Sequence, residues 1–256
     1  MPAFFERAFG EEPPVRLLDE DPDLFTGLPP QGHLEARARA VAPVIRLERG
    51  PWAAEVANIC DPDSSVGLLV LDGLLVHSIV VVHEPRSEIV GPGDVLRPWQ
   101  QESEIASVPF ASDWHVVHTA RLAVLDHRFL AFAARWPKLL SAIVERTVRR
   151  SHWLALQLAI TDLRRVDDRL MLFFWHLADR WGRVGPDGVS VPLPVTHDVL
   201  AQLVCAQRPT VTSALRRLTD DGRIRRRPDR TWLLAPEPPP MPAGVRAHLD
   251  AATIPE

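Results

Sequence analysis

The apolar positions in the first half of the chain, from Leu24 to about Leu125, occur in short runs separated by turn residues. Asp72-Gly73 separates two such runs and is typical of hairpin turns, and Gly91-Pro-Gly-Asp94 is a second turn cluster. The candidate strands are residues 66–71, 74–82 and 114–125. Many short strands with such punctuation predict an antiparallel β-sandwich or barrel.

The pattern changes near Asp126, because from there to Asp179 the chain has no glycine and a single proline, Pro137. Proline is tolerated at the start of a helix, where its missing N–H would have no partner. The seam positions recur in steps of four and three and are Leu140, Val144, Thr147, Ser151, Leu154 and Leu158. This heptad pattern predicts a long helix whose seam either packs on its own domain or joins two copies of the chain. We favour the dimer, since a long helix between two domains has little intramolecular surface to cover.

A second helix is predicted from Val166 to Trp181, and it is apolar nearly all round, which is typical of a buried helix. Gly182 ends this helix, and residues 185–188 form a turn. Further along, Thr196 is a suitable N-cap for a short helix from His197 to Val204.

Another helix is predicted to begin at Pro209, because proline favours the first helical position, and to end at Asp221-Gly222. Its predicted buried face consists of Val211, Ala214, Leu215 and Leu218. Two short helices joined by a tight turn predict a helix-turn-helix. Residues 223–234 follow as a predicted β-hairpin with its turn near Pro228-Asp229.

The charge of the chain is unevenly distributed. The net charge is −4, yet residues 205–232 carry eight arginines and three aspartates. A helix-turn-helix places one helix in the major groove, where an arginine can contact guanine O6 and N7. Arginines of an adjacent hairpin can neutralise phosphates. The placement of the arginines therefore favours DNA binding over a merely solvated face.

Val195 to Leu234 resembles the winged-helix DNA-binding domain of the Crp/Fnr-type transcription regulators, and the order of the upstream elements is also similar. The resemblance implies an α+β protein with an N-terminal β jelly roll sensor, a long dimerisation helix and a C-terminal winged helix-turn-helix. The implied divisions are an N-terminal arm (1–23), the cyclic-nucleotide-binding-like jelly roll (24–128), the dimerisation helix (129–164), the winged helix (165–236) and an irregular tail (237–256).

The resemblance also assigns roles within the helix-turn-helix. Arg208 occupies the place of an arginine that contacts guanine, whereas Pro209 replaces a glutamate that contacts cytosine. Thr210 and Thr196 match threonines that contact the DNA backbone, and Ser213 replaces a second base-contacting arginine. We therefore expect a different base preference. The predicted DNA-binding residues are Thr196, Gln207, Arg208, Thr210, Thr212, Ser213, Arg216, Arg225, Arg226 and Arg230.

The sensor departs from the cyclic-nucleotide binders of the family. The glutamate that follows the glycine-aspartate turn is missing, and the arginine-serine pair that binds the cyclic phosphate falls near Phe110-Ala111. The threonine-serine pair that contacts adenine falls near Leu154-Ala155. We therefore expect no dependence on cyclic AMP, and no cofactor. The sensor histidines leave a haem-binding variant open beside ordinary histidines, which we favour; they are His77, His83, His115 and His118.

Two other functions stay open. One is a winged helix that contacts proteins and not DNA. The other is a cupin-like metal enzyme, for which His77 and His83, expected on one face of a strand, supply too few ligands. The two cysteines are too few for a disulfide framework, a zinc ribbon or a cysteine-ligated cluster.

We expect a homodimer, and not an enzyme, that binds a near-palindromic site in double-stranded DNA. RNA polymerase and an unknown small-molecule effector stay open as further partners. No apolar run reaches the ~20 residues that a membrane span needs, and the first residues lack an apolar signal-peptide core. The expected location is the cytoplasm, without membrane binding.

Overall fold

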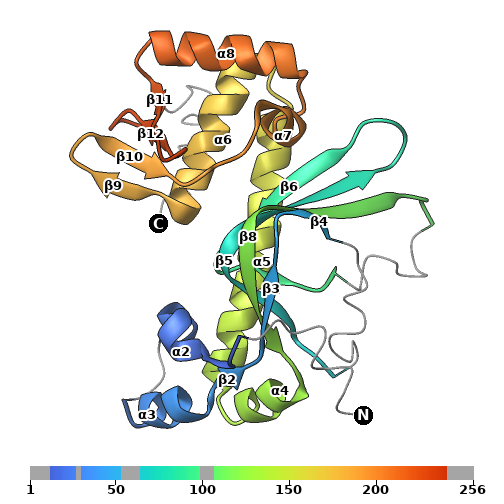
Figure 1. Ribbon diagram of the computed structural model, residues 1–256, viewed down its shortest axis with the longest axis vertical. Helices are drawn as coiled ribbons and strands as arrows, with labels where there is room; N and C mark the ends of the chain where they lie inside the picture. Colours follow the sequence, from blue (N-terminus) through green and yellow to red (C-terminus); the bar gives the residue numbers. More distant parts are fainter. Residues whose placement is uncertain (1–11, 27–29, 53–63, 99–106, 241–256) are drawn as a thin grey trace, which may run out of the picture. The chain divides into compact units, whose positions relative to one another are not determined.

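Two units make up the fold, residues 1–158 and 159–256. The computed structural model describes residues 12–26, 30–52, 64–98 and 107–240 (Figure 1). The first unit contains, in order, β1 (Val15–Arg16), α2 (Leu17–Glu20), the 3-10 helix η1 (Pro22–Phe25), α3 (Pro30–Arg39), β2 (Val41–Ala42), β3 (Val44–Leu47), β4 (Gly50–Trp52), β5 (Gly67–Val80), β6 (Arg86–Val90), β7 (Val95–Leu96), β8 (Ala111–Leu125), α4 (His127–Ala133) and most of α5 (Pro137–Thr161).

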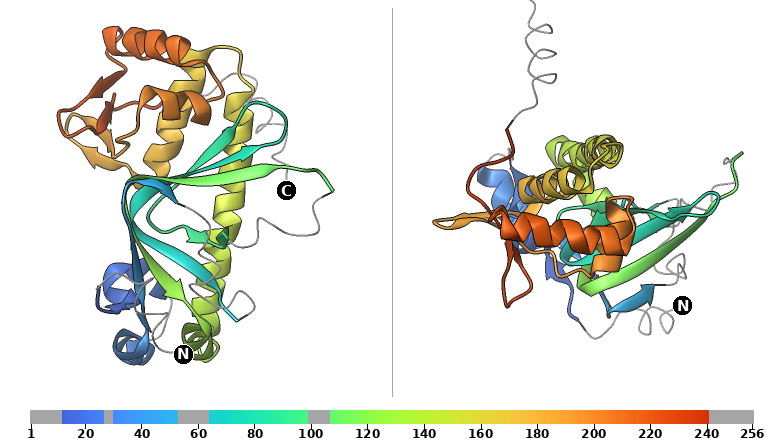
Figure 2. Two further views of the ribbon diagram at one scale, coloured as in Figure 1. Left: turned by 45° about the vertical axis from the view of Figure 1, so that its right-hand side comes forward. Right: turned by 90° about the horizontal axis from the view of Figure 1, so that it is seen from above.

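An antiparallel six-stranded sheet forms the centre of the first unit (Figure 2). Its order is β3-β8-β5-β6, with β4 paired to β8 and β7 paired to β5. Successive side chains of β5 point to opposite faces, so Leu68 and Val70 join the apolar cluster around Trp114. Leu69 points the other way and packs with the helical residues around Phe129.

The predicted hairpin turn at Asp72-Gly73 is wrong, because β5 runs through both residues as one strand. Both halves of β5 pair with β8, and the register shifts several times between Val70 and Leu75. Gly73 has φ +91°, and a Cβ there would lie 2.4 Å from the Cα of Ala120. Glycine is therefore required here because the strand bulges and its backbone lies close to that of β8, and not because the chain reverses direction.

Residues 1–23 were predicted as an N-terminal arm, but the part of this segment that the structure describes packs on the sensor. Leu17 is fully buried in the helix-covered cluster, on the short helix α2. Arg121 of β8 binds this segment through carboxylates, at 2.9 Å from Glu12 and 3.2 Å from Glu20. Residues 1–11 lie outside the described part, as do residues 241–256 of the predicted tail.

The long helix α5 spans Pro137–Thr161, whereas the predicted dimerisation helix extends from residue 129 to residue 164. One face of α5 packs on the sensor through the buried Leu139 and Ile143 and through polar contacts. Arg146 donates to the carbonyl of Gly93 at 2.8 Å and pairs with Asp21 at 2.7 Å. One turn further along the helix, Arg150 pairs with Glu88. Gln157 follows two turns after Arg150. The side-chain amide of Gln157 donates to the carbonyl of Ser87 at 2.9 Å.

A buried network continues from Glu88 into the sheet. Its carboxylate lies 2.9 Å from Nδ1 of His77, whose ring stacks on Trp114 with centroids 4.4 Å apart. Burial alone would raise the pKa of Glu88, but the hydrogen bond from His77 and the charge of Arg150 together hold the pKa below its ordinary value. The carboxylate is therefore charged, and it binds the sheet through the hydrogen bond with His77 and α5 through the ion pair with Arg150.

The second unit is built on α6 (Val166–Trp181), whose predicted limits are confirmed. The remaining elements are β9 (Arg183–Gly185), β10 (Gly188–Val191), α7 (His197–Leu203), α8 (Arg208–Asp220), β11 (Ile224–Arg226) and β12 (Trp232–Leu234). The four strands form one sheet in the order β11-β12-β10-β9. Phe174 of α6 packs against Trp232 with ring centroids 5.0 Å apart.

The predicted turn at residues 185–188 joins β9 and β10, a hairpin that was not predicted from the sequence. The two strands are three and four residues long, too short to show an alternating pattern. Gly188 has φ +131°, and a Cβ there would lie 2.0 Å from the carbonyl oxygen of Leu234. Only glycine allows β10 to approach β12 this closely.

A buried histidine makes the stability of the second unit depend on pH. Burial and the charge of Arg180 lower the pKa of His176 from 6.5 to about 4. Between these values the unfolded chain binds a proton that the folded chain does not, so the free energy of unfolding falls as the pH drops below about 6.5. Urea unfolding followed by circular dichroism at pH 7.5, 6 and 5 should show this loss. His176→Gln should flatten the acid slope, and His152→Gln, an exposed histidine on α5, should leave it unchanged.

Candidate nucleic-acid interface

The two helices α7 and α8 form the predicted helix-turn-helix. Thr196 caps α7 as expected, because its hydroxyl accepts a hydrogen bond from the N–H of Val199 at 3.3 Å. The helix α8 begins at Arg208, one residue earlier than predicted, so Pro209 occupies its second position. Between the helices, Cys205 has φ +51°, a left-handed conformation that gives the tight turn.

A half-buried arginine of α6 holds this turn. The guanidinium of Arg169 donates to the carbonyls of Val204 at 3.3 Å and Cys205 at 2.8 Å, and to that of Leu163 at 2.5 Å. The last carbonyls of a helix have no partner within the helix, so Arg169 satisfies groups that would otherwise lack a hydrogen bond. This role was not predicted from the sequence, because nothing in the local pattern of α6 distinguishes Arg169 from Arg180.

The orientation of α8 is set by two kinds of contact. Its buried face consists of Val211, Ala214, Leu215 and Leu218, as predicted. On its flank, Arg217 forms two hydrogen bonds of 3.0 Å to the carboxylate of Asp167 on α6. A bidentate pair of this kind fixes direction as well as distance. The opposite face of α8 is therefore held outward (Figure 1).

The exposed face of α8 brings together most of the predicted DNA-binding residues. Arg208, Thr212 and Arg216 are spaced by four residues and follow one strip of the helix. The side chains of Arg208 and Arg216 are 66% and 85% exposed. The other predicted positions of the helix and its N-cap are also exposed and are Gln207, Thr210 and Ser213.

The first residues of α7 lie against this strip. Nδ1 of His197 is 3.0 Å from the hydroxyl of Thr212, and a carboxylate oxygen of Asp198 is 3.5 Å from Nε of Arg208. Burial, Arg226 and Arg208 lower the pKa of His197, while Asp198 opposes them. The start of α7, the strip of α8 and strand β11 therefore meet at one place on the surface. His197 was not among the DNA-binding residues predicted from the sequence.

The predicted hairpin is confirmed as β11–β12, and its arginines point to different sides. Successive residues of a strand point to opposite faces, so Arg225 and Arg226 do not share a side. The guanidinium of Arg226 lies 5.3 Å from the ring centroid of its neighbour Trp232, on the side of His197. Arg230, at the turn with φ +66°, donates to the carbonyl of Pro194 at 3.2 Å, just before α7.

The sensor histidines are not brought together. His77 is buried against Glu88, His115 and His118 are exposed, and His83 lies beyond the end of β5, so the expected shared face of His77 and His83 is wrong. Within the described ranges, no group of three or more potential metal ligands is found.

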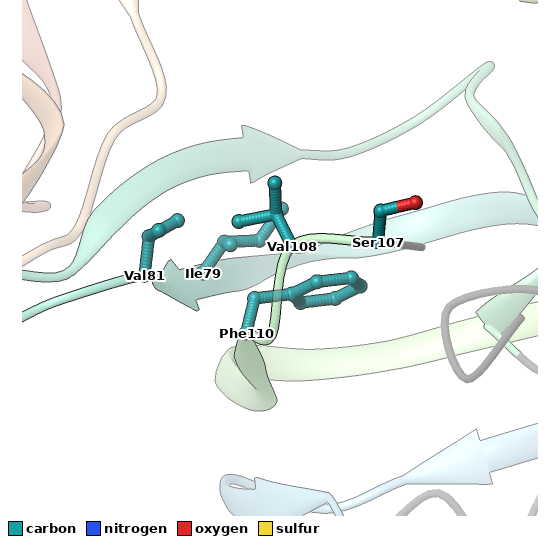
Figure 3. A pocket seen from close by; sticks show the side chains of 5 residues that line it. All are labelled: Ile79, Val81, Ser107, Val108 and Phe110. Atoms are coloured by element: carbon teal, nitrogen blue, oxygen red, sulfur yellow. The ribbon is translucent and has the colours of Figure 1, made fainter. Parts of the chain in front are cut away.

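A shallow hollow lies where β5 ends and β8 begins (Figure 3). It is lined by Ile79, Val81, Ser107, Val108 and Phe110. Phe110 is therefore part of an apolar surface at the place where cyclic-nucleotide binders of the resembled family carry their phosphate-binding arginine. None of the lining residues carries a charge that could neutralise a phosphate.

These features define a winged helix-turn-helix protein, and comparison with known proteins gives the family of this domain. Residues 168–237 match the family model of the Crp-like helix-turn-helix domain. The regulatory protein CysR of Synechococcus elongatus is 33% identical over 106 residues, which are 40% of this chain and 52% of that protein. The chain thus spans about half the length of this curated relative.

Solved structures show that the fold is shared along most of the chain. A mutant of CooA from Carboxydothermus hydrogenoformans matches 88% of this chain and 93% of its own, with TM-score 0.57 and 15% identity. A protein from Listeria monocytogenes EGD-e that contains a cyclic nucleotide-binding domain matches 79% and 94%, with TM-score 0.59 and 14% identity. FixK2 from Bradyrhizobium japonicum matches 76% and 92%, with TM-score 0.54 and 18% identity.

These similarities confirm the resemblance to Crp/Fnr-type transcription regulators, and with it the predicted α+β class of jelly roll sensor plus winged helix-turn-helix. The proteins of known role among these matches are regulators and not enzymes. In the part of the chain that the structure describes, no helix combines the length and apolarity that a membrane crossing requires.

Proposed function

We propose that this protein is a homodimeric transcription regulator that binds a near-palindromic DNA duplex. The exposed strip of α8, held outward by Arg169 and the Arg217–Asp167 pair, carries the proposal. In a symmetric dimer, two such helices enter successive major grooves roughly 34 Å apart. Binding to chromosomal DNA implies a cytoplasmic protein.

The interface has two functions. Arg208 lies at the first turn of α8 and contacts a base edge, where a guanidinium can bind guanine O6 and N7 together. Around it, hydroxyl, amide and guanidinium groups contact the DNA backbone: Thr196, Gln207, Thr210, Thr212, Ser213, Arg216, Arg225, Arg226 and Arg230. Since Arg225 and Arg226 lie on opposite faces of β11, they contact different phosphates.

The exposed seam of α5 supports the homodimer. Val144 and Leu158 are 61% and 73% exposed, and Thr147, Ser151 and Leu154 are exposed between them. Leu140, at the start of the seam, is half-buried. Arg146, Arg150 and Gln157 bind the sensor from one face of α5, whereas the exposed side chains of the seam lie on another face, where a second copy can pack.

Independence from cyclic AMP is part of the proposal. Two arginines of α5 lie near the Gly91–Asp94 turn, but Arg146 is paired with Asp21 and Arg150 with Glu88. Binding of a cyclic phosphate by either of these guanidinium groups would break one of the half-buried pairs. A different small-molecule effector and RNA polymerase stay open as further partners.

Arg208→Ala should weaken binding by about 1–3 kcal/mol and relax the preference at one base pair, because it removes a bidentate base contact. Duplexes selected from a random library by the purified full-length protein provide the site, and fluorescence anisotropy measures affinity for every single-base variant. Arg128→Ala, an exposed arginine on α4, is the control. An unchanged preference at every position would remove Arg208 from base recognition.

Arg226→Ala should weaken binding to all sequences about equally, since a phosphate contact carries no sequence information. The slope of log K against log salt concentration should decrease by about 1, because one phosphate fewer is neutralised. Anisotropy titrations over a series of salt concentrations measure both quantities. A loss confined to particular bases would contradict the phosphate role.

Leu158→Glu should dissociate the dimer, because it places a charge in the apolar seam of α5. Sedimentation velocity of the wild type and the variant measures the mass of each. Val82→Glu in the sensor is a matched control, since Val82 is also 73% exposed. A wild-type dimer that survives the change at Leu158 would place the dimer contact elsewhere.

A further inference from the structure

His197 occupies a central place on the surface proposed to contact DNA. It is half-buried at the first position of α7, and its Nδ1 lies 3.0 Å from the hydroxyl of Thr212 on α8. The charged groups that influence it come from three elements: Asp198 from α7, Arg208 from α8 and Arg226 from β11.

We propose that His197 is a further DNA-contacting residue, which donates a hydrogen bond to a backbone phosphate and takes up a proton when the duplex binds. The inference rests on the proposed DNA-binding function and adds a pH-dependent contact to that surface. Nδ1 is hydrogen-bonded to Thr212, so in the protonated ring the Nε2–H is the group left to donate to a phosphate.

The charges around His197 explain the proton uptake. In the free protein, burial and the two guanidinium groups lower the pKa of His197 and favour the neutral ring, against the weaker opposing effect of Asp198. A phosphate bound beside Arg226 neutralises the charge of that guanidinium and pairs with the imidazolium, while Arg208 contacts a base edge. The protonated ring is therefore stabilised in the complex, and DNA binding and protonation favour each other.

The affinity should consequently increase as the pH falls. For the full-length dimer on its selected duplex, at constant salt, we expect Kd to fall by about threefold or more per pH unit between about 7.5 and 6. One proton per His197 sets the upper limit, about tenfold per unit for each subunit. Anisotropy titrations at intervals of half a pH unit measure this slope.

Two substitutions separate the two protonation states. His197→Gln keeps a neutral hydrogen-bonding side chain and should bind as the wild type does at pH 8, with little change as the pH falls. His197→Arg carries a permanent charge and should bind tightly at every pH, also without a slope. His152→Gln, on the exposed part of α5, should retain the wild-type slope.

The failures are distinguishable. Sequence-selective binding with no pH slope, or an equal slope in His197→Gln, overturns the role of His197 and leaves the regulator intact. Weaker binding by His197→Arg than by the wild type at pH 7.5, with circular dichroism unchanged, also overturns the phosphate contact. Absence of sequence-selective binding at every pH overturns both the proposed function and this inference.

Discussion

The hydrogen bonds of Arg169 are the constraint on which the proposed DNA-binding surface depends. The turn between α7 and α8 leaves carbonyls at Val204 and Cys205 that no helix can satisfy, and Arg169 supplies the donors from α6. The position of α8 follows from this contact and from the pair between Arg217 and Asp167. A side chain with several donors in one plane can satisfy such divergent carbonyls, which lysine would do less well.

Paired charges perform a similar task in the sensor. Glu88 lies between His77 and Arg150, so the carboxylate has a hydrogen-bond partner on the sheet and a charge partner on α5. Polar contacts thus attach one face of α5 to the sensor, and Arg146 extends them to the Gly91–Asp94 turn. The apolar seam is left exposed, which is the property that a contact between two copies of the chain requires.

Local sequence patterns were sufficient to predict those features that depend on a single helix. The limits of α6, the cap at Thr196 and the buried face of α8 all follow from helical periodicity and capping chemistry. The same logic failed at Asp72-Gly73, where a turn dipeptide lies inside a strand. The glycine there is required by the backbone of Ala120, about fifty residues further along the chain, and no local pattern contains that partner.

The sequence by itself determined the long helices, the helix-turn-helix and the arginine-rich hairpin, because these depend on periodicity, caps and composition within short segments. Only the tertiary structure decided which side chains meet. It placed His197 beside Thr212 and brought Arg169 to the turn. These contacts join residues on different elements, and the packing that brings such elements together is a property of the whole unit.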